Sequence, residues 1–183
     1  RKLAEDVVLL TQPIWKNQAE ASGDAITINI EMDGIPNIHG DSGALLDVLS
    51  NLVFNAIAAV SPGGGRITIS GSQQNEHVVF KVADSGMGMD AATKRRCLQP
   101  YFSTKGQHGT GLGLSIVHDI VSQHDGSIEI DSKPGHGAVF TVTLPIGNPR
   151  LPAEDAAECP EPAASLRVLV VDDQLDTIDY LRT

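Results

Sequence analysis

One glycine-rich segment, GTGLGLSIV at residues 109–117, restricts the fold of this chain more than any other stretch does. Its glycines run straight into a predicted helix and leave the backbone N–H groups of the helix N-terminus accessible, where unsatisfied donors and the helix dipole attract phosphate oxygens. The spacing does not fit the dinucleotide pattern G-x-G-x-x-G, and the chain contains no Gly-Lys-Ser/Thr of a Walker A loop. The segment is therefore either a phosphate-binding loop of another fold or a flexible hinge before a helix.

A second feature lies on a helix predicted over residues 43–60. Asp47, Asn51 and Asn55 follow one another at intervals of four residues, and a step of four turns a helix by only about 40°, so the three side chains share one face. A carboxamide oxygen suits Mg²⁺, and its NH₂ group suits a phosphate oxygen. A solvated polar face is the alternative, since Asn is common on helix surfaces.

The motif DSGMGM, residues 84–89, stands where a predicted strand ends. Gly86 and Gly88 permit a backbone turn with positive φ and the close approach of a flat ligand. Asp84 offers an acceptor to an exocyclic amine such as the adenine N6 group. A simple strand-ending turn is the alternative, because Asp and Gly are common turn formers.

Residues 99–109 lack periodicity and are predicted to form a long loop. Lys105 lies in this loop, where a mobile lysine can reach a terminal phosphate, and a folding loop can exclude water from phosphoryl transfer. Tyr101 and Phe102 are expected to anchor its base. The preceding basic triplet at residues 94–96 either adds positive potential or forms a solvated face.

Hydrophobic periodicity predicts the remaining elements. Leu3, Val7, Leu10 and Ile14 recur at helical spacing, and Pro13 is expected to kink or end that first helix. Strands are predicted over residues 25–32, 66–70, 77–83, 127–131 and 138–144, and helices over 43–60, 91–98 and 112–123. The helix over 43–60 is expected to be capped by Asp41 or Ser42 and to bury Leu45, Leu49, Leu52, Val53, Ala56, Ile57 and Val60.

These elements fit an α/β fold of the α+β kind, a two-layer sandwich in which a mixed, mostly antiparallel sheet carries helices on one face. We expect this domain to cover residues 1–147. Residues 148–165 are rich in Pro, Ala and Glu and are expected to form a semi-extended linker. Residues 166–183 begin with an apolar run that stops at Asp172 and Asp173, which fits either the truncated start of a second α/β domain or an acidic tail.

Charge and composition exclude several functions. The chain has 23 Asp and Glu residues against 13 Lys and Arg, a formal net charge of −10, and only 4% aromatic residues, which argues against nucleic acid as a partner. Cys97 and Cys159 stand far apart without a CxxC motif, so we expect no disulfide framework or zinc site and a reducing, cytoplasmic setting. No apolar run approaches the roughly 20 residues of a membrane helix, so we expect no membrane span. The chain starts at Arg1, which suggests a piece of a longer protein whose membrane attachment stays open.

Taken in order, the Asn-bearing helix, DSGMGM, YFSTK and GTGLGL resemble the N, G1, F and G2 boxes of the histidine kinase catalytic, ATP-binding domain. That family has the Bergerat fold, which it shares with gyrase, the mismatch-repair ATPase and the heat-shock chaperone ATPase. The resemblance covers about residues 3–145. The stretches at residues 55–69 and 100–130 are similar to the nitrogen-regulation type of sensor kinase, and LRVLVVDDQ at residues 166–174 resembles the start of a receiver domain.

The resemblance implies roles for individual residues. Asn51 is expected to coordinate Mg²⁺, Asn55 to contact the phosphates, and Lys105 to meet the γ-phosphate. Asp84 is expected to bind the adenine amino group in a pocket shaped by the two glycines of DSGMGM. The full set of residues implied in ATP binding is Asn55, Asp84, Gly86, Gly88, Met89, Thr104, Lys105, Gly109, Thr110, Gly111, Leu112, Gly113 and Leu114.

Three positions depart from the pattern of the family. Asp47 stands where hydrolysing relatives carry a water-activating Glu, so efficient ATP hydrolysis is not expected. Ala58 stands where many kinases carry a phosphate-binding Lys, so that contact is lost or passes to Lys105. Ala138 stands where Thr or Ser often lies near the adenine, so that hydrogen bond is not expected.

The resemblance also implies partners. None of the six histidines is followed by Glu-x-x-Asn, so the phosphoacceptor is expected upstream of Arg1, on the dimerisation domain of a homodimeric hybrid kinase. Asp172 and Asp173 match the Mg²⁺-binding pair of a receiver domain, which is the expected partner in cis beside a response regulator in trans. Two alternatives stay open: a docking module that has lost nucleotide binding, which Ala58 favours, and a serine kinase of the anti-sigma type.

Overall fold

The structure is a computed structural model that describes residues 1–22, 25–32, 34–36, 40–61, 63–104 and 110–146. All of these residues lie in one unit of the chain, Arg1–Arg150. The predicted linker at 148–165 and the segment at 166–183, with Asp172 and Asp173, lie outside the described residues.

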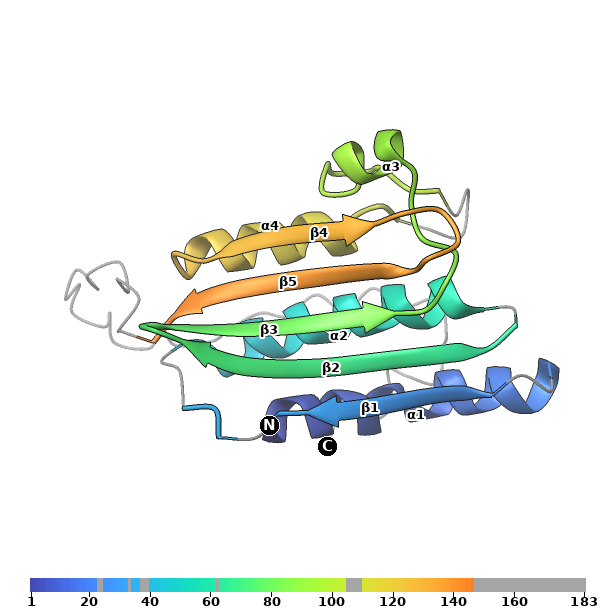
Figure 1. The fold of residues 1–183 in the computed structure, drawn as a ribbon, viewed down its shortest axis with the longest axis horizontal. Coiled ribbons are helices and arrows are strands. Elements are labelled where there is room, and N and C mark those ends of the chain that lie inside the picture. Colours follow the sequence, from blue (N-terminus) through green and yellow to red (C-terminus); the bar gives the residue numbers. More distant parts are fainter. Residues whose placement is uncertain (23–24, 33, 37–39, 62, 105–109, 147–183) are drawn as a thin grey trace, which may run out of the picture. The chain divides into compact units, whose positions relative to one another are not determined.

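The described strands form one sheet, and helices cover one of its faces (Figure 1). The elements in chain order are α1 (Lys2–Ser22), β1 (Ile26–Glu31), α2 (Ser42–Val60), β2 (Gly65–Gln74), β3 (His77–Asp84), α3 (Ala91–Arg96), α4 (Gly113–Gln123), β4 (Ser127–Ser132) and β5 (Ala138–Pro145). The strand order is β1-β2-β3-β5-β4; β1 runs parallel to β2, and the other pairs are antiparallel. The predicted two-layer sandwich with a mixed, mostly antiparallel sheet is therefore confirmed.

The core lies between the sheet and α1, α2 and α4, which stand behind the sheet in Figure 1. Side chains of β5 alternate along the strand, so that one set is buried against the helices: Ala138, Phe140, Val142 and Leu144. The register sets Val82 of β3 opposite Phe140, which brings apolar side chains of neighbouring strands together. The alternation of buried and less buried side chains along β5 thus shows which face of the sheet the helices cover.

α2 is the central helix of this core. Asp41 caps its N-terminus by accepting the Gly43 N–H at 2.8 Å, which confirms the predicted cap. The buried side chains of α2 are Leu45, Val48, Leu49, Leu52, Val53, Ala56, Ile57 and Val60, and they include every residue of the predicted apolar face. Burying this face leaves Asn51 and Asn55 outside the hydrophobic core.

Among the described helices, α2 is long and apolar enough to cross a membrane, with a mean hydropathy of 1.7. The expectation that the chain holds no such stretch is therefore wrong on length and composition. α2 packs against α1, α4 and the sheet. A helix that is covered on several sides needs little polar surface, which accounts for its composition.

α1 does not end at Pro13, which was one of the two outcomes predicted there, and its buried face differs in part from the predicted one. It continues through Pro13 to Ser22; Pro13 withholds only the N–H that would bond the carbonyl of Leu9, and Leu9 is exposed, so water can satisfy that carbonyl. The expected core residue Leu10 is 62% exposed. The buried face instead includes Thr11, whose hydroxyl donates to the Val7 carbonyl at 2.9 Å and so enters the core with its hydrogen bond satisfied.

Candidate functional site

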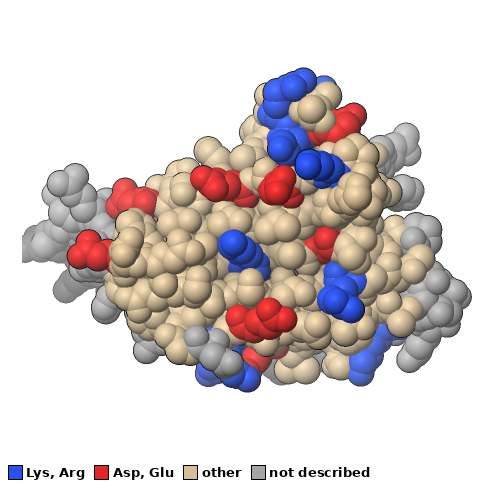
Figure 2. Space-filling model, in the orientation of Figure 1, with Lys and Arg blue, Asp and Glu red and all other residues tan. Residues whose placement is uncertain are grey.

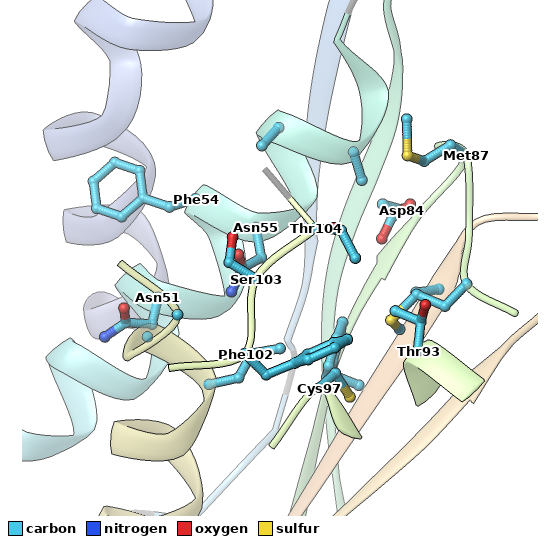
Figure 3. A pocket seen from close by; sticks show the side chains of 18 of the residues that line it. Asn51, Phe54, Asn55, Asp84, Met87, Thr93, Cys97, Phe102, Ser103 and Thr104 are labelled. Carbon is cyan, nitrogen blue, oxygen red and sulfur yellow. The ribbon is translucent and has the colours of Figure 1, made fainter. Parts of the chain in front are cut away.

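A cavity of about 440 Å³ opens between α2, the end of β3, α3 and the N-terminus of α4 (Figure 3). Most of the residues predicted to bind nucleotide or metal line it: Asn51, Asn55, Asp84, Gly88, Met89, Thr104, Thr110, Gly111, Gly113 and Leu114. Gly86 and Leu112 do not line it. Lys105 and Gly109 lie outside the described residues. The structure therefore brings three motifs that are far apart in the sequence to one cavity.

The two asparagines of α2 lie on the wall that faces α4 (Figure 3). The Asn51 side-chain amide donates to the Asp47 carbonyl at 2.9 Å, which fixes the orientation of the carboxamide. Its oxygen points at the start of α4, because a Cβ placed on Gly113 would lie only 2.7 Å from Asn51 Oδ1. Asp47 itself is exposed and does not line the cavity. Of the three polar residues predicted to share a face, two are therefore placed to meet a ligand.

Asp84 ends β3 and lies at the inner end of the cavity. One of its carboxylate oxygens accepts the Gly86 N–H at 2.8 Å, and only 9% of the residue is exposed. Burial raises the pKa of Asp84 above its ordinary value, although backbone N–H groups of Gly86 and Ala138 oppose the shift. The result is a desolvated, oriented acceptor that a ligand amine can reach.

Close backbone contacts hold the DSGMGM turn in place. Gly86 packs on the carbonyl of Ala59 at the end of α2, and the Met87 N–H donates to that carbonyl at 3.1 Å. Gly88, with φ of +65°, packs on the carbonyl of Lys133. A side chain at either glycine would push the turn away from its neighbours. Gly86 therefore positions the turn from behind the cavity rather than within it.

The N-terminus of α4 opens onto the cavity. Leu112 stands at the N-cap position and provides no side-chain cap, while Gly113 and Leu114 line the cavity. The first-turn N–H groups thus lack the usual side-chain acceptor and, with the dipole of the 11-residue helix, favour an anion. This geometry fits the phosphate-binding interpretation of GTGLGL.

Tyr101 and Phe102 play different parts at the base of the predicted loop. The Phe102 side chain lines the cavity, whereas Tyr101 is 80% exposed, so the expected anchoring by its side chain is wrong. The backbone of both residues nevertheless packs closely on Gly111, whose φ is +67°. A Cβ added at Gly111 would lie only 2.5 Å from the Tyr101 carbonyl carbon. Contact with the backbone, rather than with two aromatic rings, closes the base of the loop.

The cavity has one charged side chain among its described lining residues, Asp84. The basic residues of α3 gather on the surface instead, over the upper edge of the molecule in Figure 2, and none of them lines the cavity. In the described part of the chain, no group of three or more His, Cys, Asp or Glu side chains could hold a metal ion. A polyanion bound here would need its charge neutralised by the α4 terminus and by cations from elsewhere.

Several lining residues were not predicted from the sequence: Phe54, Ala59, Met87, Thr93, Cys97, Ser103 and Phe140. Phe140 belongs to the buried side of β5, and its alternation was visible, but nothing local in the sequence marks the end of the strand as part of a site. Burial raises the pKa of the Cys97 thiol, which behaves as an apolar wall group. Gly137, which also received no role from the sequence, packs on the Asp84 carbonyl. Its place beside the DSGMGM turn depends on pairing between β3 and β5.

Comparisons with known proteins agree with this geometry. The family described as histidine kinase-, DNA gyrase B-, and HSP90-like ATPase matches residues 40–148, which is more than half of the chain. The chain therefore belongs to this family of ATP-binding domains. Within the family it has the ATP-binding catalytic domain of sensor histidine kinases, with the Bergerat fold, as its relatives indicate.

Two curated relatives illustrate the similarity. The sensor histidine kinase ZraS of Escherichia coli (strain K12) is 43% identical over 114 residues, which are 62% of this chain and 24% of ZraS. Sporulation kinase C of Bacillus subtilis (strain 168) is 42% identical over 116 residues, which are 63% of this chain and 26% of that protein. The chain thus spans about a quarter of the length of these relatives.

Solved structures show the same fold. The catalytic domain of histidine kinase ThkA has a TM-score of 0.67 at 30% identity, covering 79% of this chain and 91% of that one. Full-length ShkA in complex with AMPPNP has a TM-score of 0.68 at 28% identity, covering 80% of this chain and 30% of that one.

Proposed function

We propose that this cavity binds Mg-ATP and that the domain transfers the γ-phosphoryl group to a histidine on a separate phosphoacceptor domain. The observation that carries the proposal is the convergence of Asp84, the asparagines of α2 and the uncapped N-terminus of α4 on one cavity. These groups match the two ends of a nucleotide, a base with an exocyclic amine and a chain of phosphates.

Each end of the nucleotide has a proposed set of contacts. Asp84 accepts a hydrogen bond from the adenine amino group, while Asn55 and the first turn of α4 contact the phosphates. Asn51 fits Mg²⁺, because its amide group is already used on the Asp47 carbonyl and its hard oxygen faces the phosphate end. When bound, Mg²⁺ supplies the positive charge that the described walls lack. Lys105 is proposed to meet the γ-phosphate.

The work of the protein in this reaction is positional and electrostatic. The bond between the γ-phosphorus and the β,γ-bridging oxygen breaks, a bond to an imidazole nitrogen forms, and ADP leaves. The described residues that line the cavity include no histidine, so the accepting histidine is proposed to come from another domain of the same or a partner chain. Residues 1–147 are proposed as this catalytic domain.

The C-terminal residues support a second part of the proposal. Residues 148–165 have the composition of a linker, and LRVLVVDDQ fits the start of a receiver domain with Asp172 and Asp173 as its Mg²⁺-binding acids. We propose a hybrid kinase of the nitrogen-regulation type that is dimeric in full length and whose catalytic domain is cytoplasmic. Its phosphoryl group would pass to a receiver in cis and to a response regulator in trans.

Titration calorimetry with Mg-ADP tests nucleotide binding. We expect the unsubstituted chain to bind, and Asp84→Asn and Asn55→Ala to weaken binding by about tenfold or more, since each removes a buried polar contact. Asp47→Asn is the matched control, because this exposed residue of the same helix does not line the cavity; it should bind normally. No detectable binding by the unsubstituted chain would contradict the proposal and favour the docking module.

A further inference from the structure

The last residue of α3, Arg96, stacks on an aromatic wall of the cavity. Its guanidinium carbon lies 4.4 Å from the centroid of the Phe102 ring, within the range in which a cation is attracted to the face of an aromatic ring. Within the described residues the Arg96 side chain forms no ion pair, and the stack on Phe102 is the contact that holds it. The side chain is exposed and does not itself line the cavity.

Phe102 connects α3 with the glycine-rich turn. Its ring lines the cavity (Figure 3), and its N–H donates to the Gln99 carbonyl at 3.2 Å. Its backbone packs so closely on Gly111 that a Cβ added there would lie 2.8 Å from the Phe102 nitrogen. α3 is itself fixed at its start, where Asp90 accepts the Thr93 N–H at 2.7 Å. A ring held by Arg96 from one side is therefore part of the cavity wall, and the backbone of the same residue packs against the turn at Gly111.

We propose that Arg96 is a positioning residue for nucleotide binding, which acts by holding the Phe102 ring in the wall of the cavity. This inference rests on the proposed function of the cavity. The stack orders the ring before the ligand arrives, so the entropy of ordering it is not lost on binding. Because Arg96 acts through Phe102 rather than on the phosphates, it should stabilise bound ADP and bound ATP equally.

The neighbouring residue provides a matched control. Arg95 is exposed on the same turn of α3, carries the same charge, and makes no recorded stack with an aromatic ring. Arg96→Met keeps much of the side-chain volume but removes the charge, and Arg95→Met makes the same change one residue away. Any effect of lost positive potential alone should appear in both variants.

Calorimetry with Mg-ADP and Mg-ATP gives the first test. We expect Arg96→Met to raise both dissociation constants by about twofold to fivefold, the range of an exposed cation–π contact, Arg96→Lys to rescue part of the loss, and Arg95→Met to bind normally. Equal losses in both Met variants would overturn the inference. A loss for Mg-ATP that clearly exceeds the loss for Mg-ADP would also overturn it, since that result indicates direct contact with the γ-phosphate.

A double-substitution cycle tests the route of the effect. If Arg96 acts through Phe102, Arg96→Met should add nothing in a Phe102→Leu background, whereas additive losses would contradict the inference. Hydrogen exchange of the nucleotide-free chain separates this inference from the proposed function. Arg96→Met, but not Arg95→Met, should speed exchange at the Phe102 amide, and unchanged exchange would contradict the stack as a positioning device even if no nucleotide binds.

Discussion

Asp84 shows how one residue combines a cost in stability with a role in binding. Burial raises the pKa of its carboxyl above the ordinary value that it has in the unfolded chain. Between these two pKa values the folded state binds more protons than the unfolded state, so the free energy of unfolding falls as pH rises through this window. Above both pKa values the ionised carboxylate therefore lowers the free energy of unfolding, and the residue lies in the cavity where a ligand amine would need an acceptor.

We expect Asp84→Asn to be at least as stable as the unsubstituted chain at pH 7, because the neutral amide removes the buried charge and its oxygen can still accept the Gly86 N–H. The difference in melting temperature should shrink as pH falls below the ordinary pKa of the carboxyl. Thermal unfolding of both chains between pH 3 and pH 8 would check this, because that range extends below the ordinary pKa of an Asp carboxyl, about 3.9. A variant that melts well below the unsubstituted chain at pH 7 would contradict it.

The contact between Asn51 and Gly113 permits a second test at the scale of single residues. Gly113→Ala places a methyl group 2.7 Å from Asn51 Oδ1. That oxygen ends a side chain that can turn away, so we expect a loss of at most about 1 kcal/mol in the free energy of unfolding, from the hydrogen bond that Asn51 makes with the Asp47 carbonyl. Urea denaturation measures this loss. In an Asn51→Ala background the same change should be nearly neutral, because the oxygen that it strikes is gone. An equal loss in both backgrounds would place the strain elsewhere.

At the scale of elements, α1 separates what periodicity can and cannot predict. The spacing from Leu3 to Ile14 indicates a helix correctly, and the face that it selects is right at Val7 but wrong at Leu10, which is exposed while Thr11 is buried. The buried face uses a small residue, Ala4, and a hydroxyl that bonds within its own helix. Ala4 and Thr11 are not strongly hydrophobic, so the sequence pattern does not mark them as core residues. Only the packing of α1 against α2 identifies them.

This correction predicts opposite results for two substitutions in α1. Val7 is fully buried, and Val7→Ala should lower the free energy of unfolding by about 1.5–3 kcal/mol through lost burial and a cavity. Leu10→Ala should change it by less than about 0.5 kcal/mol, because the larger side chain is already in contact with water. Urea denaturation of the two variants checks the assignment; similar losses in both would restore the face read from the sequence.

The strands and α2 were predicted well for a physical reason. In β5 a strict alternation matches a sheet with one covered face, and in α2 the apolar side chains match contact on several sides. The sequence was expected to contain no stretch long and apolar enough to span a membrane, but α2 is such a stretch by length and composition. Composition alone does not distinguish a core helix from a span.

At the scale of the whole molecule, the sequence predicts the polar groups of the site better than its walls. Asn51, Asn55 and Asp84 have chemistry that singles them out, and the structure brings them to one cavity. Phe54, Thr93 and Cys97 are ordinary residues on elements whose approach depends on tertiary packing. No local pattern marks them, so only the folded chain shows that they share a wall.

The proposed separation of catalytic domain and nucleophile leads to a prediction for the whole chain. With Mg-ATP alone, it should form no acid-labile phosphohistidine, because the described cavity has no histidine among its lining residues. Adding a separate histidine-bearing phosphoacceptor domain should produce phosphohistidine on the added domain only. Acid and alkali stability of the radiolabelled phosphoryl group distinguishes the products. Stable phosphohistidine on this chain alone would contradict the prediction, and phosphoserine on a partner would favour the anti-sigma type of kinase.

The strand order has a consequence for how the chain behaves at high concentration. Within the described residues the sheet ends in β1 and β4, each only six residues long. β4 carries Glu129 and Asp131 on alternate positions, and Figure 2 shows acidic side chains on this side of the open face. Both edge strands are short, and the negative charge of β4 further discourages a second copy from adding its own strand at that edge of the sheet. The layer that supports the ATP site is thereby protected against growth into an aggregate.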